Sequence, residues 1–516
     1  MNAPQRIADL LIIGGGINGT AIARDAAGRG LSVILCESQD LAEGTSSKSS
    51  KLIHGGLRYL EYLEFRLVRE ALAEREILMR TGPHVVWPQE FILPHTANLR
   101  PAWFVRLGLF LYDHLGGKRS LPGCHSVDLS RDPVGDPIRT TFKRAFSYWD
   151  CRSDDARIVV LNAVAAREAG AEILTRTAYV SSQFQDGAWR VTLRNQRTTL
   201  EQEFRARVIV NAAGPWANDV LQKLYGVKVK ESVRNVKGSH IVLPKLYEGD
   251  HAYFLQNHDR RILFVIPYEK DYTLVGNTDV AFDDDPTAVE ITPEETKYMC
   301  DICSRYFKKR VDPADVVWSW SGLRPLFDDG QDNISAITRD YALRVYQTHE
   351  GGPILSVFGG KITTGRQLAE SAMKELRKFF PSLGPSWTHK TPFPGGDVPG
   401  SDFEGFIRKL IEQYPSLPST LVRDYVRRYG TRALSMLRSV KDVRDLGKKF
   451  GGELYEREVR YLMQEEFAQT ADDILWRRTK LGLRVPKEGV RQLEAWIKSR
   501  TDSTEKKILE QGGISA

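Results

Sequence analysis

Glycines near the start of the chain have the spacing of a turn that binds a dinucleotide. Gly14-x-Gly16-x-x-Gly19 follows an apolar run, and Glu37 comes eighteen residues after Gly19. Gly14 allows a tight turn, Gly16 lets a pyrophosphate approach the backbone, and Gly19 lets a helix pack against the preceding strand. Glu37 can accept hydrogen bonds from a ribose 2′-hydroxyl, and its charge would repel a 2′-phosphate, which argues against NADP.

The segments around these glycines predict the elements that such a turn requires. Residues 7–13 predict a buried strand, 21–27 a helix and 31–35 a second strand. The first N–H groups of the helix would hold the diphosphate. A glycine motif alone is weak evidence, but strand, turn, helix, strand and acid in this order favour dinucleotide binding over an ordinary glycine-rich turn. The pattern recurs at 354–376, where Gly359-Gly360-Lys361 separates a strand from a helix, so a second helix N-terminus is expected at the cofactor.

Residues 44–61 are rich in hydroxyls and glycines and have no helical period before about Leu60. The segment is either a polar surface loop or a backbone laid along a flat ligand, with Arg58 reaching an anion. Arg324, Arg339 and Lys361 add cations near glycine-rich turns, which suits a phosphorylated substrate. Any one of these arginines is more often structural, so the interpretation requires that they converge in space.

The run Ser49–Glu61 (SSKLIHGGLRYLE), together with the glycine fingerprint, closely resembles the FAD-dependent glycerol-3-phosphate dehydrogenases of the respiratory, quinone-reducing, bacterial aerobic type. The resemblance extends over nearly the whole chain and includes Asp472–Lys480. It implies an enzyme that oxidises sn-glycerol 3-phosphate to dihydroxyacetone phosphate, with hydride transfer to non-covalent FAD and electrons passed to a membrane quinone. Two other readings stay open: a soluble oxidase that uses oxygen, and a non-catalytic flavin-binding scaffold.

Site residues follow from the motifs and the resemblance. His240 is the candidate base because a near-neutral pKa lets imidazole accept a proton, although a histidine on a strand is as often structural. The expected catalytic set is His240, Arg324 and Lys361, and the expected substrate set is Arg58, Tyr59, Arg324, Arg339 and Lys361. The residues expected at FAD are Gly14, Gly15, Gly16, Ile17, Asn18, Gly19, Glu37, Thr45, Ser46, Ser47, Lys51, Leu52, His54, Gly55, Val180, Ala213, Gly214, Gly359, Gly360 and Thr363.

The expected fold is α/β, with a Rossmann-like FAD-binding domain of the two-dinucleotide-fold flavoenzyme type. That domain would comprise 1–57, 145–230 and 340–390, and short alternating strands predict an antiparallel-sheet substrate domain of 58–144 and 231–339. In this reading Ser319–Leu326 places Arg324 at a loop rim. Residues 391–516 follow a Pro- and Gly-rich linker and predict an all-helical domain with a docking or oligomer role.

The composition and net charge of the chain limit the kinds of partner that it is expected to bind. The chain has 516 residues, a net charge of +7 and a pI near 8.9, which suits anionic substrates or an anionic membrane surface. A nucleic-acid role is not expected, because no basic stripe with interleaved aromatics occurs. Five scattered cysteines indicate a reducing compartment, and Cys300-x-x-Cys303 reads as structural rather than metal-binding. A homodimer is expected.

No secretory signal and no apolar stretch of spanning length is evident. Ala102–Leu115 is rich in aromatics and leucine, with Arg100, Arg106, Lys118 and Arg119 around it. It could lie in a membrane interface or form a buried core helix, and its apolar residues, which nearly surround the helix, do not decide between the two. The expected location is the cytoplasm, peripheral on the inner face of the cytoplasmic membrane.

Overall fold

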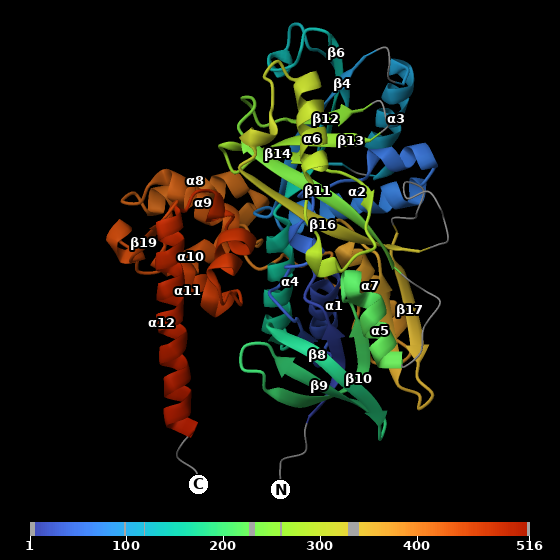
Figure 1. Cartoon of the computed structure of the whole chain (residues 1–516), viewed down its shortest axis with the longest axis vertical. Helices are drawn as coiled ribbons and strands as arrows, with labels where there is room; N and C mark the ends of the chain where they lie inside the picture. The colour runs from blue at the N-terminus through green and yellow to red at the C-terminus, as the bar shows by residue number, and fades with distance from the viewer. Residues whose placement is uncertain are drawn as a thin grey trace. The chain divides into compact units, whose positions relative to one another are not determined.

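A computed structural model describes residues 6–96, 100–117, 119–225, 233–257, 261–328 and 340–512. The chain divides into two compact units, Met1–Phe393 and Pro394–Ala516. Within the first unit, one sheet lies toward the lower end in Figure 1 and the other toward the upper end. The unit has the predicted α/β fold.

The first sheet is built around strand β1, which pairs in parallel with β2 and β10. Leu10 and Ile12 pack with helices α1 and α7, while Leu11 and Ile13 pack on the opposite face, so β1 is buried on both sides. The strand order is β17-β18-β10-β1-β2-β7, with β8 and β9 attached to β10. The strands are β1 (Ile7–Ile13), β2 (Val33–Cys36), β7 (Glu172–Leu174), β8 (Thr177–Gln185), β9 (Ala188–Asn195), β10 (Glu201–Asn211), β17 (Ala342–Gln347) and β18 (Pro353–Phe358), and the helices are α1 (Ile17–Gly28), α4 (Asp155–Glu168), α5 (Ala217–Tyr225) and α7 (Gly365–Leu376).

The second sheet is mostly antiparallel, in the order β15-β11-β14-β13-β12-β4-β6-β3, with β16 on β11 and β5 on β6. Ile241 and Val265 face a core shared with helix α6, so the alternate residues His240 and Phe264 face the other way. The strands are β3 (Leu52–Ile53), β4 (Val86–His95), β5 (His125–Asp128), β6 (Arg144–Ser153), β11 (Val233–Pro244), β12 (Ala252–Gln256), β13 (Ile262–Tyr268), β14 (Tyr272–Gly276), β15 (Val280–Ala281) and β16 (Trp318–Phe327), and the helices are α2 (Phe65–Thr81), α3 (Ala102–Leu115) and α6 (Pro293–Tyr306).

Two details of this sheet differ from the sequence interpretation. Arg324 lies in the middle of strand β16 rather than at a loop rim, because Trp318–Phe327 pairs along its whole length with β11. Strand β6, which the predicted boundary at residue 145 would assign to the first domain, pairs with β4 in the second sheet. Both differences come from strand pairing between distant segments, which local sequence patterns do not encode.

Helix α3 has only two buried residues, Leu109 and Tyr112. Trp103 is 67% exposed and Phe110 53%, and Phe104, Leu107 and Leu111 are also exposed. The reading of this segment as a buried core helix is therefore wrong. None of the helices in the described part of the chain is long and apolar enough to span a bilayer.

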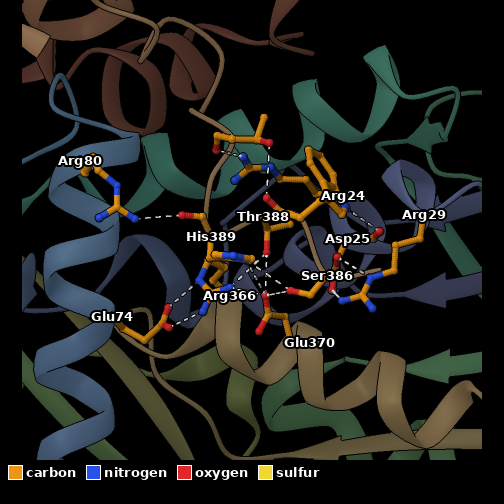
Figure 2. A network of polar contacts seen from close by, with 12 residues as sticks. Arg24, Asp25, Arg29, Glu74, Arg80, Arg366, Glu370, Ser386, Thr388 and His389 are labelled. Atoms are coloured by element: carbon orange, nitrogen blue, oxygen red, sulfur yellow. Dashed lines mark hydrogen bonds and ion pairs between the residues drawn. The ribbon is translucent and has the colours of Figure 1, made fainter. Parts of the chain in front are cut away.

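Segment 386–393, at the end of the first unit, ties α1, α2 and α7 together (Figure 2). Trp387 Nε1 donates to a backbone carbonyl of α1 at 3.2 Å, and Arg24 of α1 donates back to the carbonyl of Thr391 at 2.9 Å. Arg366 of α7 donates to a Glu74 carboxylate oxygen of α2 at 2.9 Å. Arg366 also donates to Thr388 Oγ1 of this segment at 3.2 Å, so the segment contacts both α1 and α7, the two helices that follow the glycine turns.

The second unit is helical, as predicted, with one small two-stranded sheet in addition. Its core includes Leu421, Val459 and Ile474, and a buried ion pair joins Arg428 to Glu458. A π-helical turn covers Asp473–Arg478. The elements are α8 (Phe403–Gln413), α9 (Ser419–Tyr429), α10 (Ala433–Met436), α11 (Glu456–Glu465), α12 (Lys487–Gly512), β19 (Lys449–Gly451) and β20 (Leu454–Tyr455).

Candidate functional site

A cavity of about 700 Å³ joins the two sheets of the first unit. The carboxyl ends of β1, β2, β10 and β18 contribute the turn residues at one end, and the inner face of β11, β13 and β16 lines the other end. A cavity at the carboxyl ends of parallel strands is where open α/β sheets bind ligands. Its volume is in the range of cofactor and substrate sites.

The glycine turn has the geometry that its sequence predicts. Gly14 has φ +114°, and a Cβ there would lie 2.5 Å from Ala212 O. A Cβ on Gly19 would lie 1.9 Å from Gly14 O, so this position is needed for helix packing. Gly16 is the N-cap of α1 and supplies no side-chain cap, and the only atom close to a Cβ there would be Ser46 Oγ at 3.2 Å. Such an open backbone cradle at a helix start fits a diphosphate.

Glu37 lies at the end of β2 and lines the cavity. Its Oε2 accepts from Gly15 N at 2.7 Å and its Oε1 accepts from Gln39 N at 2.8 Å. Burial raises the pKa of Glu37, and these backbone hydrogen bonds oppose that effect. Oε1 also accepts from Ser38 Oγ at 3.1 Å, so Oε2 is the oxygen that keeps capacity to accept from a ribose hydroxyl.

The second glycine turn faces the first. Gly359 and Gly360 have φ +76° and +100°, which favour glycine, and Asn18 Nδ2 of α1 donates to Gly359 O at 3.0 Å. Helix α7 begins at Gly365 without a side-chain cap. The starts of both helices therefore lie next to the same cavity, as the repeated strand–glycine–helix pattern predicts.

Most of the residues predicted at the cofactor line this cavity. Those that line it are Gly14, Gly16, Ile17, Asn18, Glu37, Thr45, Ser46, Leu52, His54, Ala213, Gly214, Gly359, Gly360 and Thr363. Those outside the lining are Gly15, Gly19, Ser47, Lys51, Gly55 and Val180.

The residues outside the lining have other contacts. Lys51 is buried, and its Nζ donates to both carboxylate oxygens of Asp155 at 2.9 Å. Val180 follows Thr177, Ala178 and Tyr179 on β8, which line the cavity, but does not line it itself. Gly55 contacts the far side of its turn, where its N–H donates to Tyr112 Oη at 2.7 Å. Lys51 and Val180 therefore lie outside the cavity lining, and their contact with the cofactor stays a prediction.

His240 is 2% exposed and lines the cavity. Its Nε2 lies 2.9 Å from Ser50 Oγ, and its ring stacks on Trp320 with a centroid distance of 5.1 Å. The ring lies across Gly276, where a Cβ would come within 2.1 Å of its Cδ2. Nδ1 is buried and has no hydrogen-bond partner in the described part of the chain. A buried polar atom without a partner is costly, which marks this ring as a candidate for a functional role.

Electrostatics keep this histidine neutral. Burial lowers the pKa of His240 well below 6.5, and the charges of Lys51 and Arg324 lower it further. If the ring hydrogen is on Nε2 and donated to Ser50, Nδ1 is a free acceptor. The arrangement can therefore take up a proton from a ligand hydroxyl.

His54 also lines the cavity, beside Phe264, with ring centroids 6.3 Å apart. Burial and the charge of Lys361 lower the pKa of His54 to about 4. Its imidazole is therefore neutral at physiological pH. This placement fits the predicted contact with the cofactor.

Three of the four predicted cations line the same cavity: Arg58, Arg324 and Lys361. Arg324 forms an ion pair with Asp279 at 2.5 Å and donates to Thr278 O at 2.8 Å. Lys361 Nζ lies 4.2 Å from the ring centre of Tyr59, which also lines the cavity. Arg339 lies outside the described residues. These three cations therefore share one cavity, and their joint contact with a phosphate stays a prediction.

Sequence reasoning missed several residues at the substrate end. Ser50 is the clearest, because it is part of the recognised Ser49–Glu61 run and could have been found there. The others lie on strands of the second sheet or, for Asn277 and Asp279, in the loop between β14 and β15, and only the pairing of that sheet reveals them. They are Asn277, Asp279, Phe254, Phe264 and Tyr148.

Comparisons with known proteins agree with this geometry. The FAD dependent oxidoreductase family matches residues 9–366, and the C-terminal domain of alpha-glycerophosphate oxidase matches residues 386–503. The chain is 53% identical to D-erythritol 1-phosphate dehydrogenase of Brucella abortus, covering 93% of this chain and 95% of that protein. It is 52% identical to glycerol-3-phosphate dehydrogenase of Pseudomonas aeruginosa, covering 92% of each. The FAD complex of glycerol-3-phosphate dehydrogenase from Bacillus halodurans is similar in structure, with a TM-score of 0.74 and 26% identity over 92% of this chain and 86% of that one.

Proposed function

The chain belongs to the family of FAD-dependent oxidoreductases, and on that premise we propose that it oxidises sn-glycerol 3-phosphate to dihydroxyacetone phosphate. One observation carries the proposal: the imidazole of His240 and the cations Arg58, Arg324 and Lys361 line the cavity that contains the dinucleotide turn. This combination suits a substrate with a hydroxyl to deprotonate and a phosphate to bind. Relatives named for glycerol 3-phosphate support the choice of substrate.

The residues that hold FAD follow from the open cradle at Gly16, the oriented carboxylate of Glu37 and the paired turns at Asn18 and Gly359. When bound, FAD supplies the hydride acceptor for the reaction. The start of helix α7, next to the second turn, places the positive end of a helix dipole beside the cavity, where it would stabilise negative charge on a reduced cofactor.

The remaining chemistry belongs to the side chains. We assign proton uptake from the C2 hydroxyl to the imidazole of His240, whose Nε2 contacts Ser50. Arg324, with Arg58, Lys361 and the predicted Arg339, would bind the phosphate. Lys361 and Arg324 would in addition stabilise the charge that develops at the reacting oxygen.

We further propose that electrons pass to a membrane quinone and that the protein lies on the inner face of the cytoplasmic membrane. The support is the exposed apolar surface of α3, where Trp103, Phe104, Leu107 and Phe110 are exposed. Tyr62, which lines the cavity, is 45% exposed and precedes Leu63, which is 72% exposed. An apolar surface next to the cavity mouth suits a lipid-soluble acceptor. The predicted homodimer stays a proposal.

D-Erythritol 1-phosphate is the second candidate substrate, because the 53% identical relative is named for it. Anaerobic mixing of the FAD enzyme with each phosphate tests both candidates through bleaching of the flavin. We expect glycerol 3-phosphate to have the higher kcat/KM, and the opposite order would assign the chain to the four-carbon substrate. Reoxidation by a quinone analogue, faster than by oxygen, is the expected second half-reaction, and faster reoxidation by oxygen would favour an oxidase.

A further inference from the structure

The turn that carries His54 and Arg58 is held on its far side by a tyrosine from another helix. Gly55 N–H donates to Tyr112 Oη of α3 at 2.7 Å, and both groups are buried. His54, Gly56, Leu57 and Arg58 line the cavity, whereas Gly55 does not. The turn therefore has one face toward the ligand cavity and one face fixed to α3.

The hydroxyl of Tyr112 has a single hydrogen, and the carboxylate of Asp150 determines where that hydrogen points. Tyr112 donates to the carboxylate of Asp150, with its Oη 2.8 and 2.9 Å from the two oxygens. Arg75 Nη1 donates to the same carboxylate at 2.9 Å. Because the hydrogen points to Asp150, the oxygen of Tyr112 is left as an acceptor for Gly55.

The groups in this chain of hydrogen bonds are buried, and the negative charge of Asp150 is balanced by the positive charge of Arg75. Tyr112 and Asp150 are each 2% exposed and Arg75 is 6% exposed. Burial raises the pKa of Asp150, and the charge of Arg75 opposes that effect. The low dielectric of such a buried setting strengthens these hydrogen bonds, and the backbone N–H of Gly55 also acts on the Asp150 carboxylate.

The turn also fits tightly against the elements behind it. A Cβ on Gly55 would lie 2.6 Å from Leu72 Cδ2 of α2 and 2.7 Å from Tyr112 Oη. Gly56 continues the chain with φ +74°, and Tyr59 N donates back to Gly56 O at 2.8 Å. The backbone at residues 54–59 has little room to shift unless the contact with Tyr112 changes.

We propose that Tyr112 is a positioning residue of the reaction, which fixes through the Gly55 amide the turn that presents His54 and Arg58 to the cavity. The proposal rests on the proposed function. A displacement of about 1 Å of a group near the reacting atoms can lower a rate by about 100-fold, so a single hydroxyl behind the turn can control turnover. Among the buried residues of α3, Leu109 and Tyr112, only the tyrosine has a polar group to make this link.

Tyr112→Phe in the FAD enzyme tests the proposal, with Tyr247→Phe as the matched control. Tyr247 is a buried tyrosine outside the cavity lining, and it donates to His251 O at 2.7 Å. Anaerobic stopped-flow measurement gives the limiting rate of flavin reduction by glycerol 3-phosphate for each variant. We expect Tyr112→Phe to lower this rate at least about ten-fold, and Tyr247→Phe to stay within about two-fold of the parent. The visible absorption of bound FAD, which needs no substrate, should change in Tyr112→Phe alone.

Two results would overturn the proposal: a Tyr112→Phe rate within about two-fold of the control variant with an unchanged flavin spectrum, or a rate loss that FAD loss fully accounts for. Each variant loses one buried hydroxyl, so a similar decrease in thermal midpoint is expected and decides nothing about positioning. If the parent enzyme is not reduced by glycerol 3-phosphate, the proposed substrate fails. The spectral comparison then still tests Tyr112.

Discussion

His240 offers the sharpest test of the proposed chemistry, through the substitution His240→Gln. Glutamine is similar in length and can still hydrogen-bond Ser50, which lies 2.9 Å from Nε2 in the parent. It cannot accept a proton near neutral pH, so the substitution removes the base and retains a polar side chain at this position. General-base catalysis contributes about 100- to 10,000-fold, or roughly 2.7–5.5 kcal/mol of barrier, and we expect a loss of flavin reduction in that range.

The pH dependence gives a second, independent readout. Because burial and the charges of Lys51 and Arg324 depress the pKa of His240, the imidazole stays neutral at pH 7. Only the neutral form can take the proton, so the reduction rate should be at its full value above pH 6.5 and fall as the pH drops through the depressed pKa. That acid limb should disappear in His240→Gln. A limb centred above 6.5 would contradict the electrostatics of the site.

Stopped-flow reduction without an electron acceptor isolates the step that His240 is proposed to serve. His251→Gln is the control, since His251 lies in the same region of the chain but outside the cavity lining. A loss below about ten-fold in His240→Gln, with the acid limb retained, would mean that another group takes the proton. His54, which also lines the cavity and is neutral, would be examined next.

Three further outcomes test the cofactor, phosphate and membrane assignments. Gly16→Val should abolish FAD binding, measured by flavin absorbance of the purified protein, because it fills the open cradle at the start of α1. Arg324→Ala should raise KM for glycerol 3-phosphate roughly ten- to a hundred-fold with little change in FAD content, since a charge-assisted contact contributes about 1.5–3 kcal/mol. Trp103→Ser combined with Phe110→Ser should weaken sedimentation with lipid vesicles, because both side chains are exposed on α3.

Matched substitutions separate these effects from general damage. Arg310→Ala removes an exposed arginine outside the cavity and should leave KM unchanged. Leu200→Ser removes a side chain that is 71% exposed outside α3 and should leave vesicle binding unchanged. A wild-type KM for Arg324→Ala would show that the phosphate is bound elsewhere. Release of the protein from vesicles by salt alone would indicate electrostatic docking instead of an embedded apolar surface.

The cofactor half of the site could be predicted because its signals are local. Strand β1, the glycine turn, α1, β2 and Glu37 occupy one uninterrupted stretch, Ile7–Glu37, and each glycine has its own steric reason. The second turn, at Gly359 and Gly360, repeats the same construction. Only the pairing of the two turns, through Asn18 and Gly359 O, required the structure.

The substrate half depends on contacts between strands that are far apart in the sequence. His240 lies opposite Trp320 on β16 and Gly276 on β14, and Gly276 lies opposite Phe264 on β13. This row of neighbours creates the flat site for the imidazole. No local sequence pattern predicts this flat site, because strand register is fixed by pairing between strands and not by the segment itself.

Helix α3 shows a different limit of prediction from sequence, which concerns the burial of its side chains. Its bounds, Ala102–Leu115, are those that the sequence suggests, yet its apolar residues lie on nearly every side. Which of them are buried depends on what the helix contacts, and its buried tyrosine is directed to Asp150 and the Gly55 turn. Hydrophobicity alone therefore could not distinguish an exposed helix from a core helix.

The neighbours Ser50 and Lys51 show why a recognised motif still does not assign its own residues. Lys51 has φ +58°, and its side chain turns into the protein to pair with Asp155. Ser50, one residue earlier, consequently faces the cavity and meets His240. The motif is continuous in sequence, but the backbone conformation divides it into residues that line the cavity and residues that hold the loop. Ser50 belongs to the first group and the side chain of Lys51 to the second, while a contact of Lys51 with the cofactor stays a prediction.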